Sequence, residues 1–330
     1  VERLRLLKPD TQNVLQLAAC IGNTFDLQTL SAIYEQSPEE TAIALLPALK
    51  QHLVLPLDSD YRFVCGVQFN EAAETTDFNP RYRFQHDRVQ QAAYALIDSQ
   101  HLPHVHLSVG RLMLEHAGDE NLAERLIDIV GHLNEGCSLI ESGEERLHLA
   151  DLNLKAGVRA RHSSAYETAM GFLQVSESLL PDDPWHSKPS LMKPLAAELQ
   201  QCAYLTGRAE EAERWIDVML RHAGTDLERG DILATRTRQY ATLGRMEASI
   251  LSAIQGLATL GIEFTDNPSA DDIARERALV DVNLGNRAIA DLLDAPLIDD
   301  PATHTAMRLL MEIFAAAFLS GSGNLFPYLV

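Results

Sequence analysis

Apolar and polar positions follow two different patterns along the chain, and the change falls near residue 100. The segment PDTQNVLQLAACIG at 9–22 has its apolar residues at helical spacing, and Gly22 predicts where that helix ends. Asp26 is placed to cap a second helix. The sequence SPEE at 37–40 predicts a capping box, so a third helix is expected from there to about Lys50.

Three short runs of β-forming residues come after these helices, at 53–57, 61–65 and 81–85. Turn-rich segments separate them, and the segment at 66–80 is long for a hairpin loop, which predicts mobility. Three helices followed by a small sheet is the element order of a winged helix. We therefore predict a winged-helix-like domain over residues 1–100.

From residue 101 onwards the pattern is helical throughout and contains a weak internal repeat. The second helix of each repeat begins near Ser164, Gly207 or Gly244, a spacing of 37–43 residues, which is longer than the roughly 34 of a tetratricopeptide (TPR) unit. A helical hairpin cannot bury its apolar face alone, so neighbouring hairpins stack into a solenoid. A small residue recurs in these second helices: Ala169, Ala212 and Ala248.

These two patterns predict a mainly α fold, in which the winged-helix domain is followed by a TPR-like α-helical hairpin repeat array, an α-solenoid. We expect a helical connector over residues 101–140 and the repeats over residues 141–330. Two late helices, at 270–293 and 301–320, are each preceded by a capping residue. The chain starts without a methionine and the array ends without a polar capping helix, which favours truncation at both ends.

Acidic residues outnumber basic ones by 47 to 27, so the formal net charge is −20. Binding to a DNA backbone or to an anionic membrane needs clustered lysines and arginines, and here these are few and scattered. The third expected helix would enter the major groove in a DNA-binding winged helix, but it offers Glu39, Glu40 and a single Lys50. No nucleic acid and no membrane is therefore expected among the partners.

Cysteine usage and the lack of a secretory signal predict a cytoplasmic location. No two cysteines have CxxC spacing, so buried free thiols are expected. The most apolar late stretch, at 309–319, contains Glu312 and is too short to span a bilayer. The cysteines are Cys20, Cys65, Cys137 and Cys202.

Three histidines lie close together in HLPHVHLSVG at 101–110, which raises the question of a metal site. His104 and His106 are two positions apart, about 200° around a helix, so their side chains are expected to point apart. His101 is expected to lie outside the helix. A tight site needs three or four converging ligands, so no metal is predicted, and surface or half-buried histidines are expected.

No standard catalytic motif occurs in the sequence. The phosphate loop GxxxxGK[ST], the dinucleotide motif GxGxxG, the kinase motifs HRD and DFG, and the hydrolase motif GxSxG are all missing. Most carboxylates have i,i+3 or i,i+4 spacing, which is typical of solvated helix faces. We therefore predict that this chain is not itself an enzyme.

The segment RFQHDRVQQAAYALI at 83–97 sets a polar cluster between a strand-like run and an apolar helix. Asp87, with Gln90 three residues later, predicts an N-cap and a capping box for that helix. His86 lies outside both expected elements and can point away from the domain. An imidazole there can donate a hydrogen bond to a phosphate oxygen of a nucleotide held by a neighbouring domain.

Two stretches carry a family resemblance, VLQLAACIGNTFDLQTLSAI at 14–33 and RFQHDRVQQAAYALI at 83–97. They resemble the region after the AAA/STAND-type ATPase core of large bacterial signalling proteins. In those proteins a Ser/Thr-kinase-like domain, the ATPase, helical repeats, a GAF domain and a sensor histidine kinase share one chain. A looser form of the second stretch occurs in LuxR/MalT-type ATPase regulators. The resemblance covers residues 1 to about 180, and the later repeats resemble generic TPR-like helices.

The resemblance implies a nucleotide-sensing role for one residue. In STAND ATPases a Met-His-Asp motif places its histidine near the β-phosphate of bound ADP, and FQHD at 84–87 is similar to it, with Gln85 in place of methionine. His86 would then sense the nucleotide, with Asp87 as the helix N-cap. The phosphate loop and Walker B motif are missing here, so ATP or ADP is expected in an upstream ATPase domain and no cofactor in this chain.

The resulting hypothesis is a non-catalytic signal-relay segment of a multidomain, ATPase-containing sensor kinase of the two-component type. Its expected partners are the neighbouring ATPase and kinase domains, and a protein or peptide on the helical repeats. Two alternatives stay open: a TPR-like protein-binding scaffold, and the central region of a LuxR/MalT-type transcriptional regulator. The parent protein is expected to be a histidine kinase, a Ser/Thr kinase or both.

Overall fold

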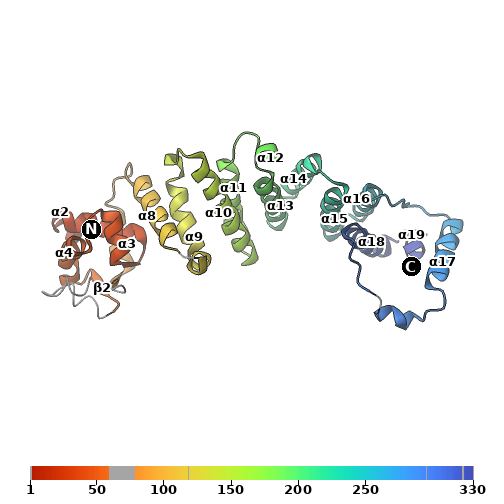
Figure 1. The fold of residues 1–330 in the computed structure, drawn as a ribbon, viewed down its shortest axis with the longest axis horizontal. Helices are drawn as coiled ribbons and strands as arrows, with labels where there is room; N and C mark the ends of the chain where they lie inside the picture. The colour runs from red at the N-terminus through yellow and green to blue at the C-terminus, as the bar shows by residue number, and fades with distance from the viewer. Residues whose placement is uncertain (1, 59–78, 118, 295, 322, 330) are drawn as a thin grey trace. The chain divides into compact units, whose positions relative to one another are not determined.

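The computed structural model describes residues 2–58, 79–117, 119–294, 296–321 and 323–329. The part that it describes is mainly helical and contains one small sheet (Figure 1), so the predicted mainly α fold is confirmed. The chain divides into two compact units. Unit 1 comprises residues 1–159 and 174–180, and unit 2 comprises residues 160–173 and 181–330.

Unit 1 starts with three helices whose ends follow the predicted caps. Helix α2 (Pro9–Ile21) stops at Gly22. Asp26 caps α3 (Leu27–Tyr34), because its carboxylate accepts a hydrogen bond from the Thr29 amide at 2.8 Å. Ser37 and Glu40 form a reciprocal capping box at the start of α4 (Pro38–Lys50). The sequence prediction is confirmed for all three helices.

A small antiparallel sheet packs with these helices. Strand β3 (Arg81–Phe84) lies between β1 (Thr24–Asp26) and β2 (Val54–Pro56). Tyr82 and Phe84 are buried, and their ring centroids lie 5.7 and 5.6 Å from that of Phe25 on β1. The strands predicted at 53–57 and 81–85 are confirmed. The run at 61–65 and most of the segment at 66–80 lie outside the described residues.

The helices and the sheet share one apolar core, in which Val14, Leu30 and Leu45 are completely buried. Each such side chain contributes about 2 kcal/mol relative to an exposed position. The other elements of unit 1 are α1 (Glu2–Arg5), α7 (Asp87–Tyr94), α8 (Leu102–His116), α9 (Asp119–Glu135), the 3₁₀ turn η1 (Cys137–Leu139) and most of α10 (Gly143–His162).

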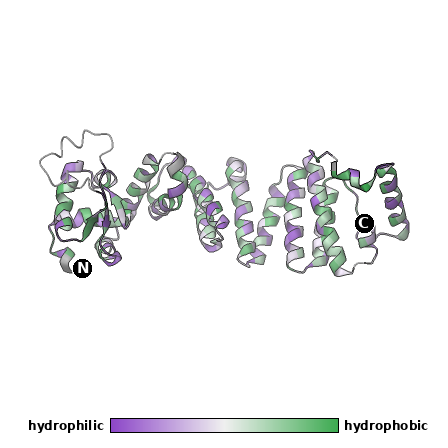
Figure 2. Cartoon of the chain, turned by 90° about the horizontal axis from the view of Figure 1, so that it is seen from below, coloured by the Kyte–Doolittle hydropathy of each residue, from purple (hydrophilic) through white to green (hydrophobic). Residues whose placement is uncertain are grey.

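Unit 2 is built from helices that pack as sequence neighbours. The pairs are α13 (Pro189–Leu205) with α14 (Ala209–His222), and α15 (Asp226–Thr242) with α16 (Met246–Thr259). Figure 2 shows hydrophobic and hydrophilic residues on the same helices, as expected when one face packs and the other is solvated. The remaining elements are α11 (Tyr166–Leu179, shared with unit 1), α12 (Pro184–Ser187), α17 (Ala270–Leu284), η2 (Ile289–Asp294), α18 (Pro301–Ser320) and α19 (Leu325–Leu329).

The turns before α11, α14 and α16 have the same backbone geometry. Ser164, Gly207 and Gly244 have φ angles of +61°, +77° and +74°. In each turn the amide of the next residue donates to the carbonyl five residues earlier, at 2.8–2.9 Å, which is a helix-ending Schellman bond. The predicted repeat therefore recurs as one structural turn, while the TPR-like arrangement of the whole array stays a prediction.

The predicted small residue of each repeat is correct in two repeats and wrong in the third. Ala169 and Ala212 are buried five residues after the left-handed position. In the third repeat Ser249 takes this position, whereas Ala248 is partly exposed. The Ser249 hydroxyl donates to the Thr237 carbonyl at 2.9 Å, so a polar side chain is satisfied where alanine was expected.

The two late helices begin as predicted, with side-chain caps at Ser269 and Asp300. Helix α17 ends at Leu284, short of the predicted residue 293, because Gly285 takes a positive φ of 56°. Helix α18 is 20 residues long and apolar enough to cross a membrane by length and composition, and 33% of its most apolar window is buried. Its buried face packs in the core of unit 2, whereas Met311, Phe318 and Leu319 on the same helix are exposed.

Candidate functional site

His86, the predicted nucleotide sensor, lies at the seam between β3 and α7. Its backbone is extended, with φ −146° and ψ 145°, and its side chain is exposed and does not cap the helix. The residues before it are fixed, because Phe84 is 2% exposed and the Gln85 amide donates to the Leu53 carbonyl at 3.0 Å. The structure thus holds an exposed imidazole on a well-anchored backbone.

Asp87 does not cap α7, contrary to the prediction. The His86 carbonyl accepts bonds from the Val89 and Gln90 amides, at 2.8 and 3.4 Å, so His86 occupies the N-cap position and Asp87 is the first helical residue. The expected capping box is also wrong, because the Gln90 side chain donates to the Ala19 carbonyl at 3.1 Å and ties α7 to α2. Asp87 instead places a negative charge in the first turn, where the helix dipole favours it.

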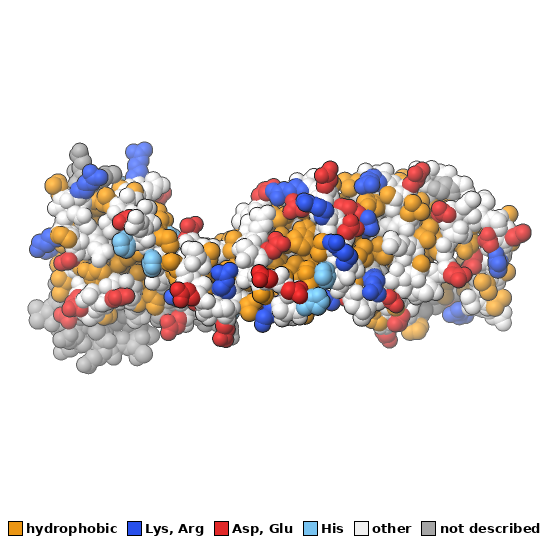
Figure 3. All heavy atoms as spheres, turned by 90° about the horizontal axis from the view of Figure 1, so that it is seen from above, with side chains coloured by type: hydrophobic (Ala, Val, Ile, Leu, Met, Phe, Trp, Pro, Cys, Tyr) orange, Lys and Arg blue, Asp and Glu red, His pale blue; other side chains and the backbone are white. Residues whose placement is uncertain are grey.

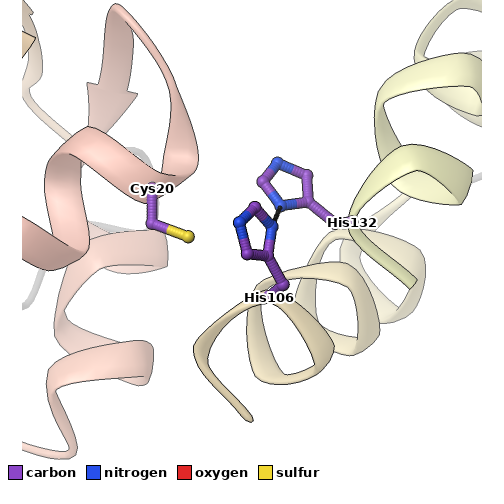
Figure 4. Close-up of side chains that lie close together, drawn as sticks. All are labelled: Cys20, His106 and His132. Carbon is purple, nitrogen blue, oxygen red and sulfur yellow. Dashed lines mark hydrogen bonds between the residues drawn. The ribbon is translucent and has the colours of Figure 1, made fainter. Parts of the chain in front are cut away.

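A second group of side chains, which can titrate or bind a metal ion, lies inside unit 1 and was not predicted from the sequence. Cys20 of α2, His106 of α8 and His132 of α9 offer a sulfur and two ring nitrogens that all lie within 4.8 Å of one another (Figure 4). Cys20 is 5% exposed and His106 is 8% exposed, and the sulfur points toward the rings. Among the described residues, this histidine–cysteine cluster is the one such group of potential metal ligands.

Two glycines let α8 and α9 approach closely enough for the rings to meet. A Cβ atom on Gly110 would lie 2.7 Å from Cδ2 of Leu133, and one on Gly136 would lie 2.6 Å from the Pro103 carbonyl oxygen. Both distances are shorter than ordinary contacts, so side chains at these positions would push the helices apart. Gly110 lies one turn after His106, and the ring centroids of His106 and His132 are 4.9 Å apart.

The hydrogen bonds of the cluster form a directed chain. The Tyr94 hydroxyl lies 2.9 Å from Nε2 of His106, and Nδ1 of His106 lies 2.9 Å from Nδ1 of His132. A hydrogen bond to the Ile21 backbone raises the pKa of the His132 ring, which fits donation from its second ring nitrogen to the Ile21 carbonyl. Because a carbonyl can only accept, the neutral rings satisfy every bond when donation runs from Tyr94 through His106 and His132 to Ile21.

Burial keeps the cluster uncharged. Desolvation, and after it the neighbouring His106, lower the pKa of His132 to about 4. Desolvation also lowers the pKa of His106, and Glu135 opposes this shift. Burial raises the pKa of the Cys20 thiol to about 12. At neutral pH the cluster is therefore two neutral imidazoles and a protonated thiol, which is a poor nucleophile.

An open cleft of about 800 Å³ lies beside the cluster. His106 and His132 line it, together with the charged residues Arg125, Asp128 and Glu135. Two acidic side chains against one basic side chain favour cations in the cleft. Both rings thus border a cleft through which a small ion can reach them from solvent, and Ile21 lines the same cleft.

The sequence predicted the directions of the helix α8 histidines but not their environment. His104 is exposed and His106 is buried, so the expectation that they point apart is confirmed. His106 was expected at the surface or half-buried, but it is buried. Its hydrogen-bond partner His132 lies 26 positions away on another helix, so the local sequence does not reveal the contact. His132 was not predicted as a site residue, although it lies beside Leu133 and one turn from Ile129 on the apolar face of α9.

The expectation of buried free thiols is met at two of the three cysteines that the structure describes. Cys20 and Cys202 are buried free thiols, and Cys137 is free and partly exposed. Cys65 lies outside the described residues, and a cytoplasmic location stays a prediction. Helix α4 exposes Glu39 and Glu40, so the surface that would meet DNA in a DNA-binding winged helix is acidic.

Comparison with known proteins gives one informative similarity. No family model and no solved structure matches the chain. The chain is similar to Hybrid signal transduction histidine kinase G of Dictyostelium discoideum, with 26% identity over 335 aligned positions. The alignment covers 89% of this chain and therefore extends over both units, but it covers 10% of that relative. The chain thus spans about a tenth of the length of a signalling protein.

Proposed function

We propose that this chain is a non-catalytic regulatory segment of a multidomain sensor kinase, which relays the nucleotide state of a neighbouring ATPase domain to a histidine kinase. The observation that carries the proposal is the similarity of 89% of the chain to part of a hybrid signal transduction histidine kinase. Because that part is 10% of the relative, kinase and ATPase domains have room elsewhere in such a protein.

The element order of the first hundred residues supports a winged-helix domain. Strand β1 lies between α2 and α3, and β2 and β3 come after α4. The sheet order β1-β3-β2 and the shared core of helices and strands agree with this architecture. In the proposed domain His86 comes two residues after the end of the central strand.

His86 is the proposed contact to a nucleotide phosphate. Its side chain is exposed, while buried Phe84 on one side and the bond from Gln90 to α2 on the other hold its backbone in place. Arg83 and Arg88 are exposed near His86 in the sequence, and with the exposed Asp87 they leave this segment slightly basic in a chain of net charge −20. An imidazole flanked by guanidinium groups suits a phosphate, and ADP in the upstream ATPase domain would be the ligand.

The test uses the full-length protein with its ATPase and kinase domains. His86→Ala is expected to weaken ADP binding about tenfold, the value of one charge-assisted hydrogen bond, and to change autophosphorylation in the presence of ADP. The matched control is His104→Ala, an exposed histidine of the same unit. Unchanged ADP affinity together with unchanged autophosphorylation in His86→Ala would refute the sensor role.

A protein-binding scaffold is the second candidate, and the recurring turns at Ser164, Gly207 and Gly244 favour it, because repeated helical hairpins often form binding surfaces. An acidic ligand is disfavoured. Arginines on these helices are already in ion pairs, and Figure 3 shows acidic and basic side chains interspersed on the face in view. The pairs are Arg208 with Glu167, Arg236 with Glu213, and Arg238 with Glu312.

One pair of variants in the full-length protein separates the two candidates. Leu233 is 1% exposed between the helices of the repeats, so Leu233→Asp is expected to disrupt them. If kinase regulation is lost in Leu233→Asp but untouched in His86→Ala, the scaffold is favoured. If both variants change the response to ADP, the relay is favoured.

A further inference from the structure

The cluster of Cys20, His106 and His132 comes close to the geometry of a zinc site. Tetrahedral Zn²⁺ with Zn–N near 2.0 Å and Zn–S near 2.3 Å needs about 3.3 Å between two nitrogens and about 3.6 Å between sulfur and nitrogen. The two Nδ1 atoms are 2.9 Å apart, and one ligand atom from each of the three residues falls within 4.8 Å of the others. Closing the cluster around an ion takes side-chain movements on the order of 1–2 Å.

The rings are already oriented as metal-ligating histidines are. In metal sites the ring nitrogen that does not bind the ion is hydrogen-bonded to a protein group, which fixes the ring. Here Nε2 of His106 meets the Tyr94 hydroxyl at 2.9 Å, and the His132 ring is hydrogen-bonded to the Ile21 backbone. Both Nδ1 atoms therefore face inward, toward each other, where an ion would be bound. This arrangement distinguishes the cluster from a chance meeting of polar side chains.

We propose that Cys20, His106 and His132 form a zinc-binding site through one sulfur and two Nδ1 atoms, and that the ion links α2 to α8 and α9. One thiolate and two imidazoles favour Zn²⁺ over Mg²⁺ or Ca²⁺, which prefer oxygen ligands. The cleft supplies a water molecule or the Glu135 carboxylate as the fourth ligand, and its acidic lining attracts the ion. The site is independent of the proposed kinase-relay function.

Binding of the ion displaces two protons, one from Nδ1 of His106 and one from the Cys20 thiol. In the metal-free chain His106 carries its proton on Nδ1 and donates it to His132. On binding, this proton moves to Nε2 and is donated to the Tyr94 oxygen, and the tyrosine hydroxyl rotates its own hydrogen away from the ring. The Cys20 thiol loses its proton to solvent as the thiolate forms. One proton is therefore released for each ion bound.

The test is metal binding by the chain of 330 residues after treatment with a chelator. Titration with Zn²⁺ alone is expected to show one ion per chain with a Kd below about 1 μM, in the range of buried three-ligand sites. Co²⁺ serves as a spectroscopic probe, because a thiolate ligand gives a charge-transfer band in the near ultraviolet. Cys20→Ser is expected to abolish that band and to weaken Zn²⁺ binding at least about a hundredfold.

Two controls and one milder variant keep the proposal falsifiable. Cys202→Ser removes another buried thiol, in unit 2, and His104→Ala removes an exposed histidine of α8, so both should bind Zn²⁺ like the wild type. Tyr94→Phe keeps all three ligands and should weaken binding about 10–100-fold, even if a ligand variant proves unstable. Failure of the wild type to bind Zn²⁺ more tightly than about 10 μM, or a charge-transfer band that survives Cys20→Ser, would overturn the site.

Discussion

Both units bury hydrogen-bonded amides and hydroxyls, but among the described residues unit 1 also contains a buried contact between helices made by histidines. In unit 1 the bonds between α8 and α9 run through His106 and His132, which can gain a proton or bind a metal ion. In unit 2 the corresponding bonds are made by amides and hydroxyls, such as Gln200 with Gln239 at 2.7 Å and Ser249 with the Thr237 carbonyl at 2.9 Å. The packing of α8 against α9 thus depends on solution conditions, whereas these bonds of unit 2 do not.

The difference has a physical consequence for stability. A buried amide or hydroxyl that is hydrogen-bonded stays neutral at every ordinary pH, so its contribution is constant. A buried imidazole contributes only while it is neutral, because folding disfavours its charged form. Each prediction below tests this contrast, from the largest expected effect to the smallest.

His132→Ala should destabilise unit 1 of the metal-free chain by about 3–4 kcal/mol. The change removes packing between α8 and α9 and leaves the buried Nδ1 donor of His106 without its acceptor. Hydrogen–deuterium exchange measures the effect separately in peptides of each unit. Exchange should accelerate in α8 and α9 and stay unchanged in α15 and α16. If α8 and α9 keep their wild-type protection in this variant, the histidine contact does not stabilise their packing.

Mild acid should weaken unit 1 before unit 2. The folded pKa of His132 is lowered from 6.5 to about 4, so its contribution is complete above pH 6.5 and is lost as the pH falls toward 4, by about 3 kcal/mol. In unit 2 the pKa values of Glu228, Asp272 and Asp300 are lowered from ordinary carboxyl values by hydrogen bonds, so their contributions persist at pH 5.

Hydrogen exchange of the metal-free chain at pH 7 and pH 5, corrected for the intrinsic exchange rate, checks this order. Protection should fall in α8 and α9 at pH 5 and hold in α15 and α16. An equal loss in both units would show that the histidines do not control the acid response.

Gly244→Ala should destabilise unit 2 by about 1 kcal/mol, and the loss should be the same at pH 5 and pH 7. The turn needs a φ of +74°, and a Cβ atom there meets no neighbour within 4 Å, so the cost is backbone strain alone. Ser164→Gly, at the equivalent turn with φ +61°, should stabilise by a similar or smaller amount. Urea denaturation followed by tryptophan fluorescence reports on this unit, since Trp185 and Trp215 both belong to it.

His86→Ala should change the stability of the chain by less than about 0.5 kcal/mol. The side chain is exposed and does not cap α7, so its removal costs neither packing nor a helix hydrogen bond. Comparison with His132→Ala shows how the stability contribution of a histidine in unit 1 depends on whether its side chain is exposed or packed between helices. A loss above 1 kcal/mol in urea denaturation would mean that His86 supports the fold rather than facing a ligand.

Features that depend on a few neighbouring residues could be predicted from the sequence. The caps at Asp26, Ser37, Ser269 and Asp300 are such features, because each is settled within about four positions. The cap of α7 could not be predicted in the same way. The helix begins one residue earlier than predicted, because the His86 carbonyl accepts the first helical bonds, and Gln90 bonds to Ala19, 71 positions away, instead of closing a capping box.

Features that depend on the packing of distant segments could not be predicted from the sequence. The pairing of His106 with His132 requires two helices to cross at Gly110 and Gly136, and the periodicity of either helix alone does not fix that crossing. Cys20 joins the cluster from a third helix, 86 positions before His106. A histidine on the apolar face of α9 was the available signal, and it could have identified one member of the cluster but not its partners.

Because α8 and α9 are in close contact at Gly110, the hydrogen bond between His106 and His132 is sensitive to the angle between the two helices. The contact with Leu133 acts as a pivot, and His106 stands one helical turn from it, about 6 Å along the axis. A rotation of about 10° between α8 and α9 around that pivot would move the ring by on the order of 1 Å, enough to break a 2.9 Å hydrogen bond. Small angular changes in unit 1 are thereby converted into the presence or absence of a single bond.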